Sequence, residues 1–273
     1  MSKQNQISRV TAPQITARKG GEPIVCLTAY DAPTASLIDE HCDLILVGDS
    51  VGMVVHGLSS TVGVTLEMMI LHGQAVMRGA QHALVVVDLP FGSYEDSPET
   101  AFKNASRVMI ETGCQAIKIE SGTYAAETIR YLVERGIPVM SHVGLRPQSM
   151  NVLGGFRARG RSKKVADEII ENAIAAAEAG SFAVVVEGVS EVLAKKVTKA
   201  VPIPTIGIGA SNECDGQILV TPDMLGLFDW TPKFVKKYGD LKSVIETSAK
   251  QYAQDVKNRS FPSEEFTYRF TKK

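Results

Sequence analysis

The sequence predicts an α/β protein built as a single (β/α)8 barrel, in which eight parallel strands alternate with helices. Three observations lead to this fold class. Eight short, almost wholly apolar runs follow one another along the 273 residues. Segments with the period of an amphipathic helix lie between most of these runs, and no change of composition divides the chain. An unbroken set of eight runs favours a closed barrel over an open sheet.

The apolar runs are too short for typical helices and are rich in β-branched residues. Most are apolar on both faces, as expected of parallel strands that helices cover. They comprise residues 24–30, 44–50, 83–90, 116–121, 139–145, 182–188, 204–211 and 216–224. Only Asn212 to Asp215 separates the seventh run from the eighth. We therefore expect irregular pairing at that position of the barrel.

Three segments between the runs have a clear helical period. Residues 65–80 carry apolar side chains three and four positions apart, and residues 164–180 are rich in Ala and Glu. Residues 97–113 begin with Ser97 as a candidate N-cap and end on Gly113. A capping residue before a helix and a glycine after it are the usual boundaries.

The two ends of the chain lie outside this strand and helix pattern. Residues from about 8 to 20 resemble an amphipathic helix, which we expect to close the barrel bottom. The aromatic tail at about 260–273 is either a docking segment for a neighbouring subunit or a frayed terminus. One domain is expected over residues 1–273.

Composition narrows the class of partner. With 44% hydrophobic and 22% charged residues, the chain can bury a core, which excludes a disordered or fibrous protein. A formal net charge of −1 gives no field that would attract nucleic acid or an anionic membrane. No apolar run reaches the roughly 18 residues of a membrane span, and residues 1–21 lack the apolar centre of a signal peptide. The four cysteines have no zinc-site spacing, so we expect reduced thiols in a cytoplasmic protein with a small-molecule partner.

Polar residues stand at the carboxyl ends of five consecutive runs, where (β/α)8 barrels place their active sites. They are Asp49, Ser50, Asp88, Lys118, Glu120, His142 and Glu187. Each has an ordinary explanation by itself, since a strand-end Asp often caps the next helix and a lone His is often a satisfied core residue. Five strands that share the feature favour an active site.

Three of these residues, Asp49, Asp88 and Glu120, supply hard oxygen ligands without a cysteine or histidine cluster. That set suits Mg2+, which binds a few carboxylates and keeps positions for water and substrate. A metal there could bind the keto oxygen and carboxylate of a 2-oxo acid and stabilise its enolate as a Lewis acid. Lys118 and Glu120 lie two apart on a strand and so share a face. An internal ion pair between them is the alternative interpretation.

The remaining polar residues have candidate roles around that substrate. Lys118 and Ser50 can bind its carboxylate through a charge and a hydroxyl. Glu187 ends the apolar sequence VVVE, where burial favours the basicity that a general base needs. His142, one strand away, is the competing base.

The stretch at residues 151–162 makes the connection after the fifth run longer than ordinary strand-to-helix loops. It carries Arg157, Arg159 and Arg161. A mobile lid is the favoured interpretation. An RNA-binding segment is disfavoured because the net charge is close to zero.

Several stretches together resemble the ketopantoate hydroxymethyltransferase (3-methyl-2-oxobutanoate hydroxymethyltransferase) family. They are LTAYD (27–31), LVGDSVGM (46–53), DLPFGSY (88–94), KIE (118–120), HVGLRPQS (142–149), GGFRARGR (154–161) and IGIGASNECDGQ (206–217). They occur in order over residues from about 24 to 225, which makes the resemblance highly specific.

The resemblance implies a barrel of the phosphoenolpyruvate/pyruvate type and transfer of a one-carbon unit from 5,10-methylenetetrahydrofolate to 3-methyl-2-oxobutanoate. The product would be 2-dehydropantoate, in the first committed step of pantothenate and coenzyme A biosynthesis. The resemblance further implies Mg2+ at Asp49, Asp88 and Glu120, and a homodecamer of two five-membered rings. Substrate contacts would come from Asp49, Ser50, Asp88 and Lys118, with Glu187 as proton acceptor.

Two other functions remain possible from the sequence. One is a different metal-dependent carbon–carbon lyase or mutase that acts on 2-oxo acids, although the cysteine-containing loop of such enzymes is not found here. The other is a non-catalytic oligomeric scaffold, which would gain nothing from buried charges at its strand ends.

Overall fold

In the computed structural model, which describes residues 9–269, eight parallel strands form a closed barrel in chain order. The strands are β1 (Ile24–Thr28), β2 (Leu44–Val47), β3 (Leu84–Asp88), β4 (Ala116–Glu120), β5 (Val139–Gly144), β6 (Ala183–Glu187), β7 (Thr205–Ile208) and β8 (Gly216–Leu219). All eight predicted runs contain a strand, and β8 pairs with β1 to close the barrel. The predicted (β/α)8 barrel is confirmed.

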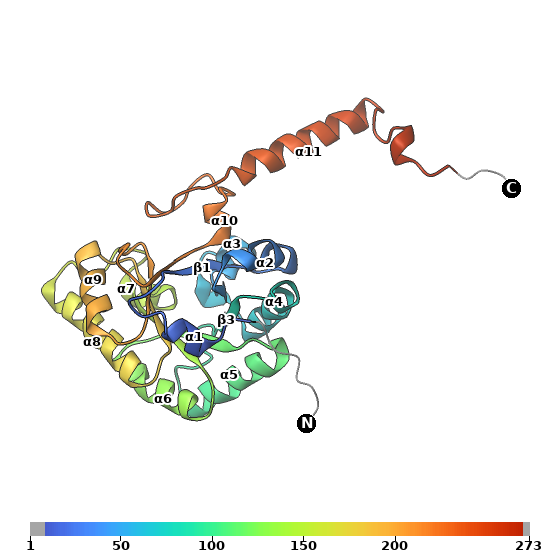
Figure 1. Ribbon diagram of the computed structural model, residues 1–273. Coiled ribbons are helices and arrows are strands. Elements are labelled where there is room, and N and C mark those ends of the chain that lie inside the picture. The colour runs from blue at the N-terminus through green and yellow to red at the C-terminus, as the bar shows by residue number, and fades with distance from the viewer. Residues whose placement is uncertain (1–8, 270–273) are drawn as a thin grey trace, which may run out of the picture. The chain divides into compact units, whose positions relative to one another are not determined.

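Helices cover the outside of the barrel (Figure 1). The longer ones are α2 (Ala32–Ile38), α4 (Leu66–Gly79), α5 (Pro98–Thr112), α6 (Ala126–Glu134), α8 (Lys163–Glu178) and α9 (Glu191–Ala200). Short helical turns follow three strand ends, namely α3 (Val51–Val54), α7 (Met150–Leu153) and α10 (Thr221–Met224). The three predicted helices correspond to α4, α5 and α8. Ser97 caps α5 by accepting a hydrogen bond from the Thr100 N–H at 3.2 Å, and Gly113 ends it with φ 79°.

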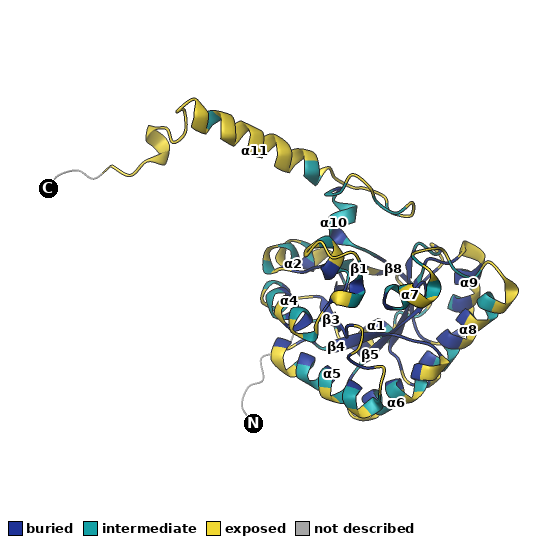
Figure 2. Ribbon diagram, turned by 180° about the vertical axis from the view of Figure 1, so that it is seen from behind, coloured by how far each residue is buried: buried dark blue, intermediate teal, exposed yellow. Residues whose placement is uncertain are grey.

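The core has two layers because side chains alternate along each strand. On β2, Leu44 and Leu46 point into the barrel, whereas Ile45 and Val47 point toward the helices. Figure 2 shows the strands dark blue, with exposed yellow residues on the outer faces of the helices. The four cysteines are buried free thiols, as expected.

The amino-terminal helix α1 (Ala12–Thr16) is shorter than the predicted helix at about 8–20, and residue 8 lies outside the described residues. It still closes the barrel bottom. Ile15 is fully buried in the inner core layer, and the Thr16 hydroxyl donates to the Phe182 carbonyl oxygen at 3.0 Å.

Two carboxylates at this bottom end have several donors each. Asp39 accepts hydrogen bonds from the backbone N–H groups of Gln81, His82 and Ala83, at 2.6 to 2.9 Å. Asp215 accepts from the ammonium of Lys19 at 2.9 Å, from the Gly20 N–H at 2.8 Å and from the Thr205 N–H at 2.8 Å. These bonds tie loops that precede different strands to one another.

The irregular pairing predicted between the last two strands is present. β7 and β8 share two registered pairs, Ile206 with Gly216 and Gly207 with Gln217. Turns over residues 209–215 join the strands directly, in the place of a crossover helix. The β7–β8 pairing is therefore the shortest in the barrel.

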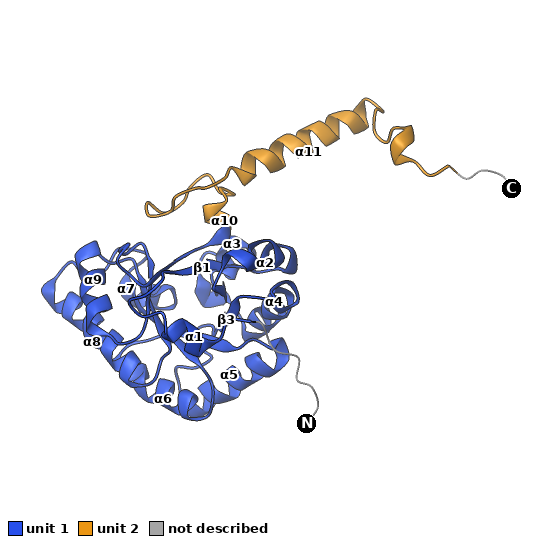
Figure 3. Cartoon of the chain, viewed as in Figure 1, with its two compact units in different colours: residues 1–221 blue, residues 222–273 orange. Residues whose placement is uncertain are grey.

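The chain divides into two compact units, residues 1–221 and 222–273 (Figure 3). The first contains the barrel. The second contains α11 (Leu241–Lys257), a 17-residue helix that the sequence reasoning did not identify and whose residues are all exposed or half-buried. In the tail, the Phe261 ring lies 5.6 Å from the ring of Tyr252, and residues 270–273 lie outside the described range. One domain over residues 1–273 stays a prediction. No helix within residues 9–269 is both long and apolar enough to cross a membrane.

Candidate active site

The strand register brings the predicted polar residues together at the carboxyl end of the barrel. Asp88 on β3 stands beside Lys118 on β4, and Glu120 on β4 stands beside His142 on β5. Glu187 ends β6, the next strand. Asp49, Asp88, Lys118, Glu120 and His142 are all buried.

Lys118 forms an ion pair with Asp88 rather than with Glu120. Its ammonium lies 2.6 Å from Asp88 Oδ1, while Asp88 Oδ2 accepts the Asp49 backbone N–H at 3.0 Å. Burial lowers the pKa of Lys118, but the carboxylates of Asp88 and Asp49 outweigh burial and leave the pKa above its ordinary value. The interior therefore keeps one fixed positive charge.

The other two buried carboxyls are weak acids here. Burial, and then the negative charge of Asp88, raise the pKa of Asp49 to about 7 against the opposing effects of Lys118 and Gln148. Burial also raises the pKa of Glu120 to about 8, opposed by a hydrogen bond from the Gln148 backbone. Ionising both carboxyls in this interior is costly unless a cation compensates their charge.

His142 and Glu187 face each other across β5 and β6. His142 Nε2 lies 3.1 Å from Glu187 Oε2, and the two side chains are 4% and 16% exposed. The contact lacks hydrogen-bond geometry, and both ring nitrogens of His142 are without a hydrogen-bond partner among residues 9–269. Burial lowers the pKa of His142, so its imidazole is neutral near pH 7. Both predicted candidates for the base thus lie at one place.

A glycine permits this approach. Gly144 ends β5 with φ 96°, a region that L side chains rarely adopt. A Cβ at this position would collide with the carbonyl oxygen of Glu187. The next residue, Leu145, donates its N–H to that same oxygen at 2.8 Å.

Ser50 lies at the edge of the cluster and is half-buried. Its hydroxyl is 2.8 Å from the phenol oxygen of Tyr30. Burial strongly raises the pKa of Tyr30, so the phenol stays protonated and can donate. Tyr30 therefore orients Ser50, a role that the sequence did not predict for Tyr30.

The carboxylates match Mg2+ in donor type. Glu120 Oε2 is buried and has no hydrogen-bond partner among the described residues, whereas Asp88 Oδ1 is paired with the Lys118 ammonium. A buried oxygen in the condition of Glu120 Oε2 is suited to a hard cation. No group of three His, Cys, Asp or Glu side chains in residues 9–269 is arranged to hold a metal ion. The three-carboxylate metal site stays a prediction.

The predicted long connection lies between β5 and α8 and includes the short helix α7. Its action as a mobile lid stays a prediction. Gly154 and Gly155 follow α7 with φ of 73° and 108° and open space around them. The Arg159 N–H donates to the Gly188 carbonyl oxygen at 2.7 Å, directly after Glu187. Arg157 and Arg161 are exposed.

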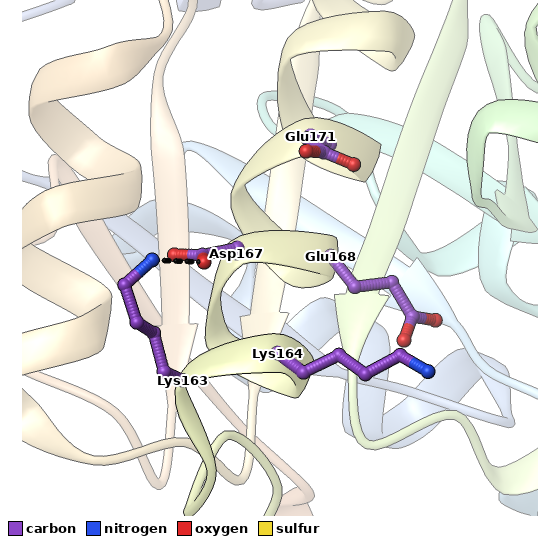
Figure 4. Close-up of a pocket in the computed structure, with 5 residues that line it drawn as sticks. All are labelled: Lys163, Lys164, Asp167, Glu168 and Glu171. Atoms are coloured by element: carbon purple, nitrogen blue, oxygen red, sulfur yellow. Dashed lines mark hydrogen bonds and ion pairs between the residues drawn. The ribbon is translucent and has the colours of Figure 1, made fainter.

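A separate surface hollow lies on the first turns of α8 (Figure 4). It is lined by Lys163, Lys164, Asp167, Glu168 and Glu171. Lys163 is paired with Asp167 at 2.6 Å. The hollow contains none of the predicted site residues, so the strand ends remain the candidate active site.

A family model described as ketopantoate hydroxymethyltransferase matches residues 9–264. The chain belongs to this family. The resemblance drawn from the motifs is therefore confirmed, and so is the prediction of an enzyme of the ketopantoate hydroxymethyltransferase class.

Relatives in the ketopantoate hydroxymethyltransferase family match along almost the whole chain. A protein of Maricaulis maris named 3-methyl-2-oxobutanoate hydroxymethyltransferase is 67% identical and covers 95% of this chain and 93% of its own. A protein of Caulobacter vibrioides with the same name is 63% identical and covers 97% of both chains.

Solved structures with the same fold are distant in sequence. Phosphoenolpyruvate phosphomutase from Streptomyces platensis subsp. rosaceus aligns over 95% of this chain and 92% of its own, with TM-score 0.62 and 12% identity. A phosphonopyruvate hydrolase in complex with oxalate and Mg++ aligns over 93% of both chains, with TM-score 0.59 and 11% identity. At such identities the likeness shows the fold alone, which is again a (β/α)8 barrel.

Sequence reasoning missed Gln148, which donates hydrogen bonds to both Asp49 and Glu120. It lies in a loop and has no strand-end position to single it out. Its presence in the stretch HVGLRPQS was the one available signal.

Proposed function

We propose that the protein transfers a hydroxymethyl group from 5,10-methylenetetrahydrofolate to 3-methyl-2-oxobutanoate, giving 2-dehydropantoate. In this reaction the substrate loses a C–H proton, a new C–C bond forms, and water supplies the hydroxyl as tetrahydrofolate leaves. The principal support is the 67% identical relative that carries this name over nearly the same length. A buried set of carboxylates, an ammonium and a His–Glu pair is the chemistry that such a reaction needs.

Mg2+ is the proposed metal, with Asp49, Asp88 and Glu120 as the residues that would hold it. When bound, it would supply Lewis-acid stabilisation of the charge that develops on the keto oxygen. Glu120 Oε2, a buried carboxylate oxygen without a hydrogen-bond partner among residues 9–269, supports this assignment. The phosphonopyruvate hydrolase of similar fold was solved with Mg++ and oxalate.

The protein's own groups then divide the remaining work. Lys118 provides the positive charge and Ser50 the hydroxyl for the substrate carboxylate and keto group, together with Asp49 and Asp88. Glu187 takes the proton from the substrate carbon. Neutral His142, 3.1 Å away, holds Glu187 in place or receives the proton onward.

The lid is the proposed contact for the folate. Positive charge is carried here by Arg157, Arg159 and Arg161. The backbone of Arg159 is bonded to the carbonyl oxygen of Gly188, the residue after Glu187. The anionic glutamate tail of a folate complements that charge.

The protein would act in the cytoplasm, in the first committed step of pantothenate and coenzyme A biosynthesis. Four buried, unpaired cysteines are compatible with a reducing compartment. Pathway and compartment both follow from the proposed reaction.

A homo-oligomer, a decamer of two five-membered rings, is the proposed assembly. Its support is α11, which carries Val244, Ile245, Tyr252 and Val256 at helical spacing with each side chain at least 44% exposed. An apolar stripe of this kind is normally covered. Together with the tail at 260–273, it would dock on a neighbouring subunit. Light scattering of the wild type and of Ile245→Glu tests this. A charge in the apolar stripe should lower the measured mass of the assembly.

The deciding assay combines the purified protein with Mg2+, 3-methyl-2-oxobutanoate and 5,10-methylenetetrahydrofolate, and detects 2-dehydropantoate by mass spectrometry. Chelation should abolish turnover and added Mg2+ should restore it. A lyase or mutase would instead consume other 2-oxo acids without folate, and a scaffold would do neither. Full activity in rigorously metal-free protein would refute the metal assignment.

A further inference from the structure

Gln148 lies at the entrance of the lid, in the helical turn Pro147–Ser149 that follows β5. Its side chain is buried although it belongs to a loop. A buried amide must satisfy two N–H donors and one carbonyl acceptor. Gln148 satisfies all three, with one partner in the loop after β2 and two in the loop after β3.

The two N–H groups point at the metal-site side of the barrel. Nε2 donates to Asp49 Oδ2 at 2.8 Å and to the Leu89 carbonyl oxygen at 3.0 Å. The amide oxygen accepts the Tyr94 hydroxyl at 2.5 Å. The reverse orientation of the amide would place oxygen against two acceptors, so the network fixes a single orientation.

The backbone of Gln148 holds the second carboxylate. Its N–H donates to Glu120 Oε1 at 2.9 Å. The Tyr94 hydroxyl, which donates to the Gln148 amide, also accepts the Glu120 backbone N–H at 3.1 Å. One residue therefore fixes Glu120 directly and through Tyr94.

These bonds orient the carboxylates without neutralising them. An amide carries no charge, so it does not compensate the negative charge that Asp49 and Glu120 would carry when a cation ionises them. One oxygen of Glu120 is held by Gln148, while the other, Oε2, has no hydrogen-bond partner in the described residues. A cation could bind that oxygen without a change in the orientation of the carboxylate.

We propose that Gln148 is a positioning residue of this site, whose amide and backbone N–H hold Asp49 and Glu120 in the geometry that binds the metal. The inference rests on the proposed function for the presence of a metal there. It adds that metal affinity depends on a residue of the loop after β5 that is not itself a ligand. Partners of metal ligands typically affect metal affinity by about 10- to 100-fold.

The test measures Mn2+ binding, because free Mn2+ is quantified directly by electron paramagnetic resonance. Gln148→Met keeps the length of the side chain and removes its three hydrogen bonds. We expect its Mn2+ dissociation constant to rise about tenfold or more. The matched control is Gln74→Met, since Gln74 is a surface glutamine of α4 with one bond to the Glu111 carbonyl oxygen. The control should bind Mn2+ like the wild type.

Tyr94→Phe provides an independent variant with little change in volume. It removes the hydroxyl that locks the Gln148 amide, so its Mn2+ affinity should also fall, but less. If both act through one network, the double variant should lose less than the product of the two single losses. Should Gln148→Met fail to fold, Tyr94→Phe decides alone, and unchanged Mn2+ affinity in it would overturn the proposal.

The outcomes distinguish failure of the Gln148 proposal from failure of the proposed function on which it rests. Wild-type protein that binds no Mn2+ refutes the proposed metal site itself. Wild-type binding with an unchanged dissociation constant in Gln148→Met overturns the inference alone. A second readout is hydrogen exchange of 3-methyl-2-oxobutanoate in D2O, which saturating Mn2+ should largely restore in Gln148→Met. Failure of that rescue would mean that Gln148 does not act through the metal.

Discussion

The buried polar side chains at the two ends of the barrel differ in how many hydrogen-bond partners they have. At the bottom, Asp39 accepts three backbone N–H groups, and Asp215 has an ammonium and several N–H donors. At the top, Glu120 Oε2 and both nitrogens of His142 have no hydrogen-bond partner among residues 9–269. The same kinds of side chain are thus satisfied at one end and left available at the other.

This difference separates stability from chemistry. A carboxylate with a full set of donors stabilises the loops it joins, whereas an unsatisfied one lowers stability and keeps its oxygens for a ligand. In (β/α)8 barrels the carboxyl end of the strands is the catalytic end. Substitutions at the two ends should therefore have opposite consequences.

The largest effect is expected from removing a top carboxylate. Asp88→Ala and Asp49→Ala should fold yet lose metal-supported substrate binding, with activity falling about 10³-fold or more, because Lewis-acid stabilisation amounts to several kcal/mol. Calorimetric titration with Mg2+ and 3-methyl-2-oxobutanoate measures the binding. Wild-type affinity in either variant would contradict the assigned ligands.

Glu187→Gln should have the next largest effect. The enzyme with Mg2+ and the keto acid should exchange the C–H beside the ketone in D2O even without folate. Removing the base should lower both this exchange and turnover by about 10²–10⁴-fold. His142→Asn is the comparison and should keep much of the exchange. Normal exchange in Glu187→Gln would transfer the role to His142 or to water.

Asp39→Asn tests the bottom end. The amide replaces one acceptor oxygen by a donor that faces backbone N–H groups, which should cost about 2 kcal/mol of unfolding free energy. For a domain of this size that corresponds to a fall in Tm of about 4–8 °C. Thermal unfolding measures it, while kcat/KM should stay within about twofold of the wild type. A large loss of activity in folded Asp39→Asn protein would contradict the view that the bottom end serves stability alone.

The sequence predicted those features of the site whose signal is local, and it did not predict contacts between residues far apart along the chain. Asp88 and Lys118 were found because a polar residue at the end of an apolar run is a local signal. Their ion pair depends on the register of β3 against β4, which one strand cannot specify. The network of Gln148 joins residues up to 99 positions apart and left no pattern along the chain.

The fold was more predictable than the ends of its elements. Eight apolar runs predicted eight strands, since burial imposes a local composition. Helix α1 is shorter than its amphipathic stretch. Helix α11 was missed, although its apolar stripe has helical spacing.

A smaller effect concerns stability in acid. Burial lowers the pKa of His142 in the folded protein below its ordinary 6.5. The unfolded chain therefore binds a proton here first as the pH falls through about 6.5, and the folded state loses stability. Relative to His142→Asn, the wild type should lose Tm between about pH 7.5 and pH 5.5. A constant difference between the two proteins would show that His142 is charged or free to titrate in the fold.

The smallest effect is expected at the lid. Replacing Arg157, Arg159 and Arg161 by alanine should raise the KM for folate by about three- to tenfold, more at low salt, with little change for the keto acid. The matched control is Lys163→Ala with Lys164→Ala, which removes nearby positive charges at the hollow on α8. An unchanged folate KM in the triple variant, measured by steady-state kinetics, would refute the folate contact.

The glycine that ends β5 limits how this enzyme can evolve. Any side chain at Gly144 would push against the carbonyl oxygen of Glu187 and move this proposed base away from His142. Random mutagenesis for a new 2-oxo acid should therefore recover no functional variants at this position. Residues 150–156, with open space around Gly154 and Gly155, should accept diversity. Libraries that seek altered specificity should hold residue 144 constant and vary that segment.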